Sequence, residues 1–249
     1  DTSVVQFESC KGQYFVMKKF KSTSFKHFKQ FFREFDTISS INQQCIVKFH
    51  RYINSMIDIP NPLLFVEYLP YTLKDILEDK SLSFKITNTQ LVSIIVDIAF
   101  GLRYLHEDKQ VMHRNLKPEN ILITKKCHGK IGDFCWANII DVDLIYSQKD
   151  SKSISYMAPE LLNSDEYNEK VDQYSFGKLI YYIISGGKNP PFNPNEIENG
   201  VCFKNLPSFS YFASKIMNKC CSYVPENRPL FSEIIKEMVK NNFNFFTKY

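Results

Sequence analysis

His113-Arg114-Asn115-Leu116-Lys117-Pro118-Glu119-Asn120 is the most informative stretch of this sequence. Its third residue, Asn115, is a neutral amide, which forms hydrogen bonds but does not accept a proton as a carboxylate does. The apolar run Ile121-Leu122-Ile123 and a turn at Gly129 separate this stretch from a second one, Lys130-Ile131-Gly132-Asp133-Phe134-Cys135. Around these two stretches, the pattern of apolar residues divides the chain into two unlike parts.

The first part of the chain has the pattern of strands and the second part that of helices. Strands are predicted at Val4–Phe7, Gln13–Phe20 and Leu63–Val66, with a helical segment carrying Phe28, Phe31, Phe32 and Phe35 between them. After about residue 72, Leu91, Ile94, Ile95, Ile98, Leu102 and Leu105 form one apolar helix face, with cap candidates at Thr87–Thr89. Further helices are predicted at Val171–Ser185, ending at Gly186-Gly187, and at Tyr211–Cys221 and Phe231–Val239. This order predicts an α+β protein, with a small β-rich lobe at residues 1–70 and a larger helical lobe at residues 71–249 of a single domain.

The composition of the chain bears on which partners the protein binds and where in the cell it is found. The 249 residues are 44% hydrophobic and carry a net charge of +4 from scattered lysines, which does not indicate a nucleic-acid partner. No apolar run reaches membrane-spanning length, so we expect no membrane contact from this segment. The seven cysteines include no C-x-x-C pair, which favours reduced thiols and a cytoplasmic location.

The motifs resemble those of the eukaryotic protein kinases. His113–Asn120 resembles the catalytic loop His-Arg-Asp-Leu-Lys-Pro-Glu-Asn at every position except Asn115. Lys130–Cys135 resembles the segment that contains Asp-Phe-Gly, and Tyr156–Glu160 resembles the end of the activation segment. The resemblance covers about residues 2–240. It implies the two-lobed kinase fold and the tyrosine-kinase-like branch. Lys117, by contrast, is the catalytic-loop residue of Ser/Thr kinases, so the resemblance implies a Ser/Thr-type catalytic loop.

The resemblance also implies a site for ATP and Mg²⁺. Lys18, in Phe15-Val16-Met17-Lys18, matches the lysine that contacts phosphates, and alternation along a strand puts it on the same face as Val16. Glu34 would be its ion-pair partner. By the same resemblance, the metal ligands are Asn120 and Asp133, and the other residues that contact ATP are Glu67, Leu69 and Leu122.

The sequence departs from the kinase pattern in three places. Asn115 stands where the family has the carboxylate that accepts the proton of the attacking hydroxyl. Cys135 replaces the glycine at the root of the activation segment, which continues through Ser153 to Glu160, the expected partner of Arg228. No glycine-rich loop is visible, and because the chain opens at Asp1 without Met, we expect that loop to precede it.

Three functional hypotheses follow. The first is an ATP-binding pseudokinase, or strongly weakened Ser/Thr kinase, that signals through protein substrates or partner kinases. The second is an active Ser/Thr protein kinase, since positioning and electrostatics supply most of the acceleration of phosphoryl transfer. The third is a nucleotide-free interaction domain, which requires Lys18, Asn120 and Asp133 all to be vestigial. Nucleotide binding separates the third from the others, and turnover separates the first two.

Overall fold

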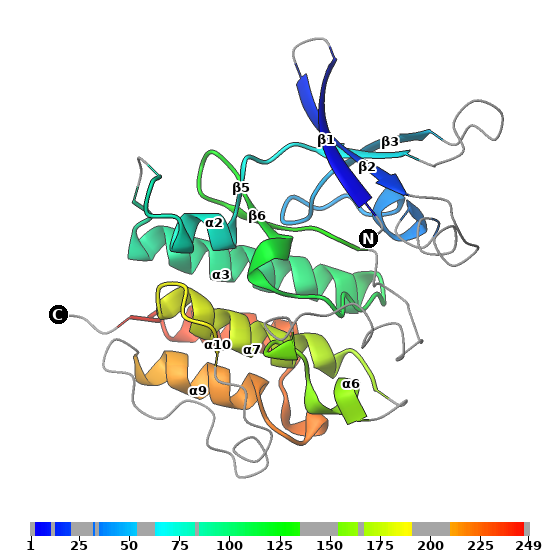
Figure 1. Ribbon diagram of the computed structural model, residues 1–249. Helices are drawn as coiled ribbons and strands as arrows, with labels where there is room; N and C mark the ends of the chain where they lie inside the picture. Colours follow the sequence, from blue (N-terminus) through cyan, green and yellow to red (C-terminus); the bar gives the residue numbers. More distant parts are fainter. Residues whose placement is uncertain are drawn as a thin grey trace.

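The protein consists of a small part rich in β-structure and a larger helical part (Figure 1). The computed structural model describes residues 3–10, 13–20, 32, 35–53, 63–82, 85–134, 154–163, 167–190 and 210–246. This is the two-lobed α+β fold that the order of strands and helices predicts.

The small part is built on a four-stranded antiparallel sheet with the order β1-β2-β4-β3. Its strands are β1 (Ser3–Cys10), β2 (Gln13–Phe20), β3 (Phe49–Ile53) and β4 (Leu63–Glu67). The strands predicted around Val4–Phe7, Gln13–Phe20 and Leu63–Val66 are therefore confirmed. The first four residues of β4 are all buried, as expected of an apolar strand covered on both faces.

A second, smaller sheet connects the two parts of the protein. It joins β5 (Tyr71–Thr72), β6 (Ile121–Ile123) and β7 (Gly129–Ile131) in antiparallel order. The segment before β3 is fastened to β7, because Val47 N–H donates to the Ile131 carbonyl at 2.9 Å and Ile131 N–H donates to the Cys45 carbonyl at 2.8 Å. These bonds fix the end of β7, and therefore the start of the segment containing Asp133.

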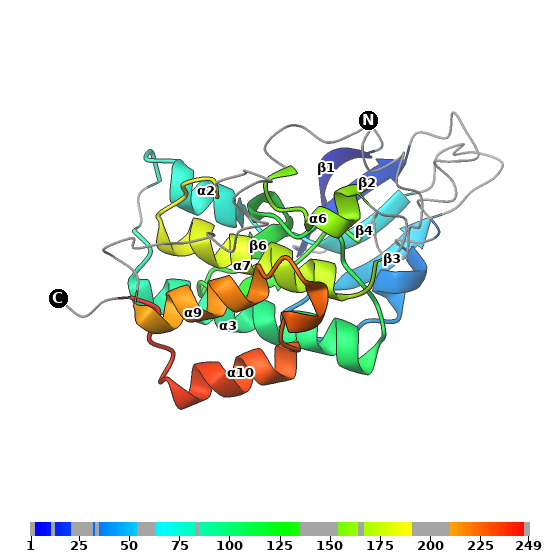
Figure 2. The same cartoon turned by 90° about the horizontal axis from the view of Figure 1, so that it is seen from below.

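The helical part is organised around two long helices (Figures 1 and 2). Its helices are α2 (Leu73–Glu78), α3 (Asn88–Arg103), α6 (Pro159–Asn163), α7 (Lys170–Ile184), α9 (Tyr211–Cys220) and α10 (Phe231–Lys240). α3 packs against α7 and α10, and α7 packs against α9. Within the described residues, no helix is both long and apolar enough to cross a membrane.

The apolar face predicted for α3 is buried along its whole length. All six apolar residues of that face have exposed fractions of 6% or less. Thr87 caps the helix through a capping box with Gln90, as its position in the sequence predicts. The helix nevertheless changes geometry earlier than the pattern suggests: after Arg103 the chain forms a π-helical turn, Tyr104–Asp108. Such a turn inserts one extra residue per turn and so changes which side chains point inward.

The glycine pair after α7 ends that helix as predicted. Gly186 and Gly187 have φ angles of +69° and +88°, in the left-handed region that residues with a Cβ rarely adopt. The Gly187 N–H donates to the Tyr182 carbonyl at 2.9 Å, which satisfies one of the last carbonyls of the helix.

Candidate active site

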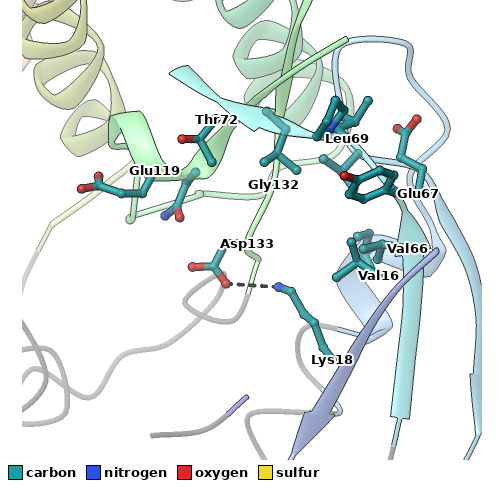
Figure 3. A pocket seen from close by; sticks show the side chains of 15 residues that line it. Val16, Lys18, Val66, Glu67, Leu69, Thr72, Glu119, Gly132 and Asp133 are labelled. Atoms are coloured by element: carbon teal, nitrogen blue, oxygen red, sulfur yellow. Dashed lines mark hydrogen bonds and ion pairs between the residues drawn. The ribbon is translucent and has the colours of Figure 1, made fainter. Parts of the chain in front are cut away.

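A cavity of about 380 Å³ lies between the four-stranded sheet and the β6–β7 hairpin (Figure 3). Segments far apart in the sequence meet there, namely β2, β4, the chain from β4 to β5, and the residues flanking β6 and β7. The lining consists of Val16, Lys18, Ile38, Val47, Val66, Glu67, Tyr68, Leu69, Pro70, Thr72, Glu119, Asn120, Leu122, Gly132 and Asp133.

One end of the cavity is apolar. Val16 and Val66 are paired across β2 and β4, and both line the cavity together with Leu69 and Leu122. Branched side chains on both sides of a narrow space suit a flat, apolar ligand group.

The other end of the cavity carries opposite charges. Lys18 Nζ lies 3.4 Å from Asp133 Oδ1, and the two side chains are 16% and 30% exposed. Lys18 shares a strand face with Val16, so the alternation along β2 places both in the cavity, as predicted (Figure 3). Asp133 has a φ angle of +63°, a conformation that aspartate tolerates better than most residues.

Buried Asp172 on α7 holds the loop that contains Asn115. Its carboxylate accepts hydrogen bonds from the backbone N–H groups of His113 and Arg114, each at 2.7 Å, and from His106 Nε2 at 2.8 Å. Burial alone would raise the pKa of Asp172, but the hydrogen bond from His106 and the neighbouring histidine and backbone donors lower it below its ordinary value. A carboxylate held ionised in this way fixes Arg114, whose φ angle is +63°.

His113 connects this loop to the segment before Asp133. Its Nε2 lies 2.9 Å from the Gly132 carbonyl, while its Nδ1 accepts the Asn115 N–H at 3.3 Å. Nδ1 therefore acts as the acceptor and Nε2–H as the donor, which is the neutral form of the ring. Burial lowers the pKa of His113, in agreement with this assignment.

Asn115 donates its side-chain amide to Asp133. The distance from Nδ2 to Asp133 Oδ2 is 3.0 Å, and Asn115 is buried at 7% exposure. Asn120 donates in turn from its own Nδ2 to the Asn115 carbonyl at 2.7 Å, within the 3₁₀ turn Pro118–Asn120. Because the nitrogen of Asn120 is used in this bond, its side-chain oxygen is the atom left to act as a ligand.

The amino-acid sequence as a whole matches the family model described as protein tyrosine and serine/threonine kinase, over residues 4–238. This match covers both parts of the fold and every element around the cavity. The chain belongs to the protein kinase family.

Several curated kinases are similar to this kinase domain. Serine/threonine-protein kinase VIK of Arabidopsis thaliana is 30% identical over 85% of this chain and 50% of its own length. Cysteine-rich receptor-like protein kinase 26 of the same plant is 32% identical over 74% of this chain and 28% of its own length. Dual specificity protein kinase shkE of Dictyostelium discoideum is 34% identical over 59% of this chain and 22% of its own length. The chain thus spans half or less of the length of these relatives.

Some residues singled out in the sequence lie away from the cavity or outside the described residues. Glu34, Cys135 and Ser153 belong to the latter group. Lys117 is half-buried outside the cavity lining, and its carbonyl accepts the Asn120 N–H at 2.9 Å. Glu160 forms the expected ion pair with Arg228, with Arg228 Nη2 2.9 Å from Glu160 Oε2.

Glu67 lines the cavity, but its carboxylate has partners elsewhere in the kinase domain. Its Oε1 accepts from Lys130 Nζ at 2.6 Å and from the Lys48 N–H at 2.7 Å. One carboxylate oxygen of Glu67 therefore already has two donors within the protein. No role was assigned to Lys130 from the sequence. The alternation of side chains along β7 does not indicate that Lys130 pairs with Glu67, which is distant in sequence.

Sequence reasoning also missed other parts of the site. Val47, Val66 and Thr72 line the cavity without having been assigned to it. Branched residues in these strands and turns look the same in a sequence whether they face a core or a cavity. His106 was missed as a partner of Asp172 because the π-helical turn that directs it inward has no counterpart in the apolar pattern.

Proposed function

We propose that this domain binds ATP with Mg²⁺ in the cavity and transfers the terminal phosphate to protein hydroxyls very slowly or not at all. The observation that carries the proposal is the meeting of Lys18, Asp133 and Asn120 in one cavity, with the buried Asn115 hydrogen-bonded to Asp133 behind them. In this proposal residues 1–249 form one domain, with lobes at 1–70 and 71–249, and the cavity lies between the lobes.

The shape and charge of the cavity support nucleotide binding. Val16, Val66, Leu69 and Leu122 supply apolar walls for the base. Lys18 supplies a cation for the phosphates at the opposite end. A volume of about 380 Å³ lies within the range of small-molecule sites. We assign Glu34, by family resemblance alone, as an ion-pair partner of Lys18.

The donor atoms at the polar end fit Mg²⁺. Asp133 offers a carboxylate and Asn120 an amide oxygen, which are hard ligands of the kind that Mg²⁺ uses together with nucleotide phosphates. The bound ion would neutralise charge on the phosphates. The residues of the chain would orient the nucleotide, with Lys18 placed to hold phosphate oxygens once Asp133 turns toward the metal.

Asn115 limits the chemistry at the position of the attacking hydroxyl. An amide there can accept a hydrogen bond from a substrate hydroxyl, but it cannot remove the proton. The loss of a general base typically slows a reaction by about 10²- to 10⁴-fold. By the family resemblance, Lys117 belongs to the catalytic loop and Cys135, Ser153 and Glu160 to the activation segment. In this proposal the domain engages protein substrates or partner kinases in signalling.

An active Ser/Thr kinase is the second candidate. Apart from Asn115, the polar groups around the cavity are those the family uses, and positioning supplies much of the rate. A nucleotide-free interaction domain is the third, and the Lys18–Asp133 contact within a cavity argues against it. We keep a cytoplasmic location as part of the proposal, on the ground that Cys45, Cys127, Cys220 and Cys221 are free thiols.

Calorimetric titration with ATP and Mg²⁺ tests nucleotide binding. We expect saturable binding to the unaltered protein, and stabilisation of about 2.7 kcal/mol when ATP is present at about 100 times its dissociation constant. Lys18→Met is expected to weaken binding. Lys48→Met is the matched control, since Lys48 is exposed outside the cavity. The proposal is wrong if ATP gives no heat and no thermal shift, or if both variants behave alike.

A further inference from the structure

The carboxylate of Asp133 is already held by donors of the protein itself. Its Oδ2 accepts from Asn115 Nδ2 at 3.0 Å, and its Oδ1 lies 3.4 Å from Lys18 Nζ. The amide nitrogen of Asn115 must face Asp133, because the amide oxygen would be repelled by a carboxylate at this distance. Asp133 thus meets a neutral donor on one oxygen and a cation on the other.

The backbone of Asn115 is fixed on both sides, so this donor is aimed in advance. Its N–H donates to His113 Nδ1 at 3.3 Å, and its carbonyl accepts from Asn120 Nδ2 at 2.7 Å. Asp133 needs such support, because its left-handed backbone conformation persists only where the surroundings hold it. The bond from Asn115 is one of the contacts that supply this support.

An aspartate at position 115 would reverse the electrostatics of this contact. Two carboxylates would then lie about 3 Å apart, and neighbouring like charges disfavour each other unless a cation lies between them. With the amide of Asn115, no cation is needed between the two side chains, because the amide nitrogen donates a hydrogen bond to the Asp133 carboxylate.

We propose that Asn115 is a positioning residue that takes the place of a cation at Asp133, so that nucleotide binding by this domain depends only weakly on Mg²⁺. This inference rests on the proposed nucleotide-binding function and states how nucleotide binding at that site depends on the metal. In this proposal Asn115 keeps the binding site ordered without the metal, but it cannot remove the proton of the attacking hydroxyl.

The first test compares nucleotide affinity with and without the metal. Calorimetric titrations with ADP and with a non-hydrolysable ATP analogue are run in millimolar Mg²⁺ and in EDTA, on the unaltered protein and on Asn115→Asp. We expect the ratio of the two dissociation constants to stay below about tenfold in the unaltered protein, and to grow by about a further tenfold or more in Asn115→Asp, which corresponds to about 1.4 kcal/mol. Equal ratios in the two proteins would overturn the inference.

The second test uses no nucleotide, so it separates this inference from the proposed function. Asn115→Asp is expected to melt at a lower temperature than the unaltered protein in EDTA and to recover when Mg²⁺ alone is added. Asn218→Asp makes the same chemical change on the exposed face of α9 and should show neither effect. If no protein binds nucleotide, the proposed function fails, and the melting comparison alone decides the role of Asn115. Melting of Asn115→Asp that matches the unaltered protein in EDTA, without recovery in Mg²⁺, would refute that role.

Discussion

The loop that carries Asn115 is held by contacts that do not involve the Asn115 side chain. The loop is held by groups on either side of Asn115: Asp172 binds the backbone of His113 and Arg114, and His113 reaches the Gly132 carbonyl. None of these bonds uses the side chain at position 115. The loss of a carboxylate there is therefore compatible with an intact kinase fold.

We expect His113 to give the fold a pH dependence. Its pKa is lowered by burial, so the folded protein keeps the ring neutral at pH values where the unfolded chain takes up a proton. The stabilisation is present above the unfolded pKa of about 6.5, and we expect the free energy of unfolding to fall as the pH drops below that value. Urea denaturation between pH 7.5 and pH 5 measures the slope.

One variant isolates this effect. His113→Gln should flatten the slope in this range. A slope that survives in His113→Gln would show that another group causes it.

At the level of single elements, the pattern of apolar residues and caps predicted most of the structure. The capped face of α3, the glycine stop of α7 and strands β1, β2 and β4 of the four-stranded sheet follow from local rules of spacing and turn chemistry, whereas β3 was not predicted. The π-helical turn after α3 could not be predicted in this way. Within this turn Leu105 is fully buried and His106 Nε2 lies 2.8 Å from Asp172 Oδ2, a residue distant in sequence.

The ion pair between Arg228 and Glu160 ties the start of α6 to the loop before α10. Arg228 is fully buried, and it also donates to the Ser222 and Lys170 carbonyls at 2.8 and 2.9 Å. Arg228→Met should cost about 3–5 kcal/mol in the free energy of unfolding, because it leaves Glu160 and two carbonyls without their donor.

Urea denaturation measures this cost against a control. Arg103→Met removes a more exposed ion pair with Asp108 and should cost less than about 1 kcal/mol. Similar losses in the free energy of unfolding would mean that the buried ion pair stabilises this fold no more than the exposed one.

At the scale of the whole molecule, the site exists only because distant segments converge. The motif resemblance predicted which residues meet, including Lys18, Asp133 and Asn120. It did not predict the bond from Asn115 to Asp133, because the family pattern has a carboxylate at that position. Nor did it predict that Lys130 would engage Glu67. Such contacts depend on three-dimensional distances that a single sequence does not contain.

Close packing of α7 against α9 sets the arrangement of the helical part. A Cβ added at Gly177 would lie 2.6 Å from Cys221 Sγ and 2.9 Å from Cys220 Cβ, which is closer than atoms normally approach. Gly177→Ala should therefore destabilise the protein by about 1–3 kcal/mol, although alanine is the better helix former. Thermal melting checks the sign, and an increase in melting temperature would show that α7 and α9 can separate freely.

The central claim is that Asn115 leaves a nucleotide-binding kinase domain without its proton acceptor. The measurement that tests it most directly is the rate of phosphate transfer from labelled ATP to a generic protein substrate. The unaltered protein and Asn115→Asp are compared at saturating ATP and Mg²⁺, with any residues that precede Asp1 in the native protein retained. The account predicts very slow transfer by the unaltered protein and a gain of about 10²-fold or more in Asn115→Asp, or about 2.7 kcal/mol of barrier. Ordinary kinase rates in the unaltered protein, or no gain in a variant that still binds ATP, would contradict it.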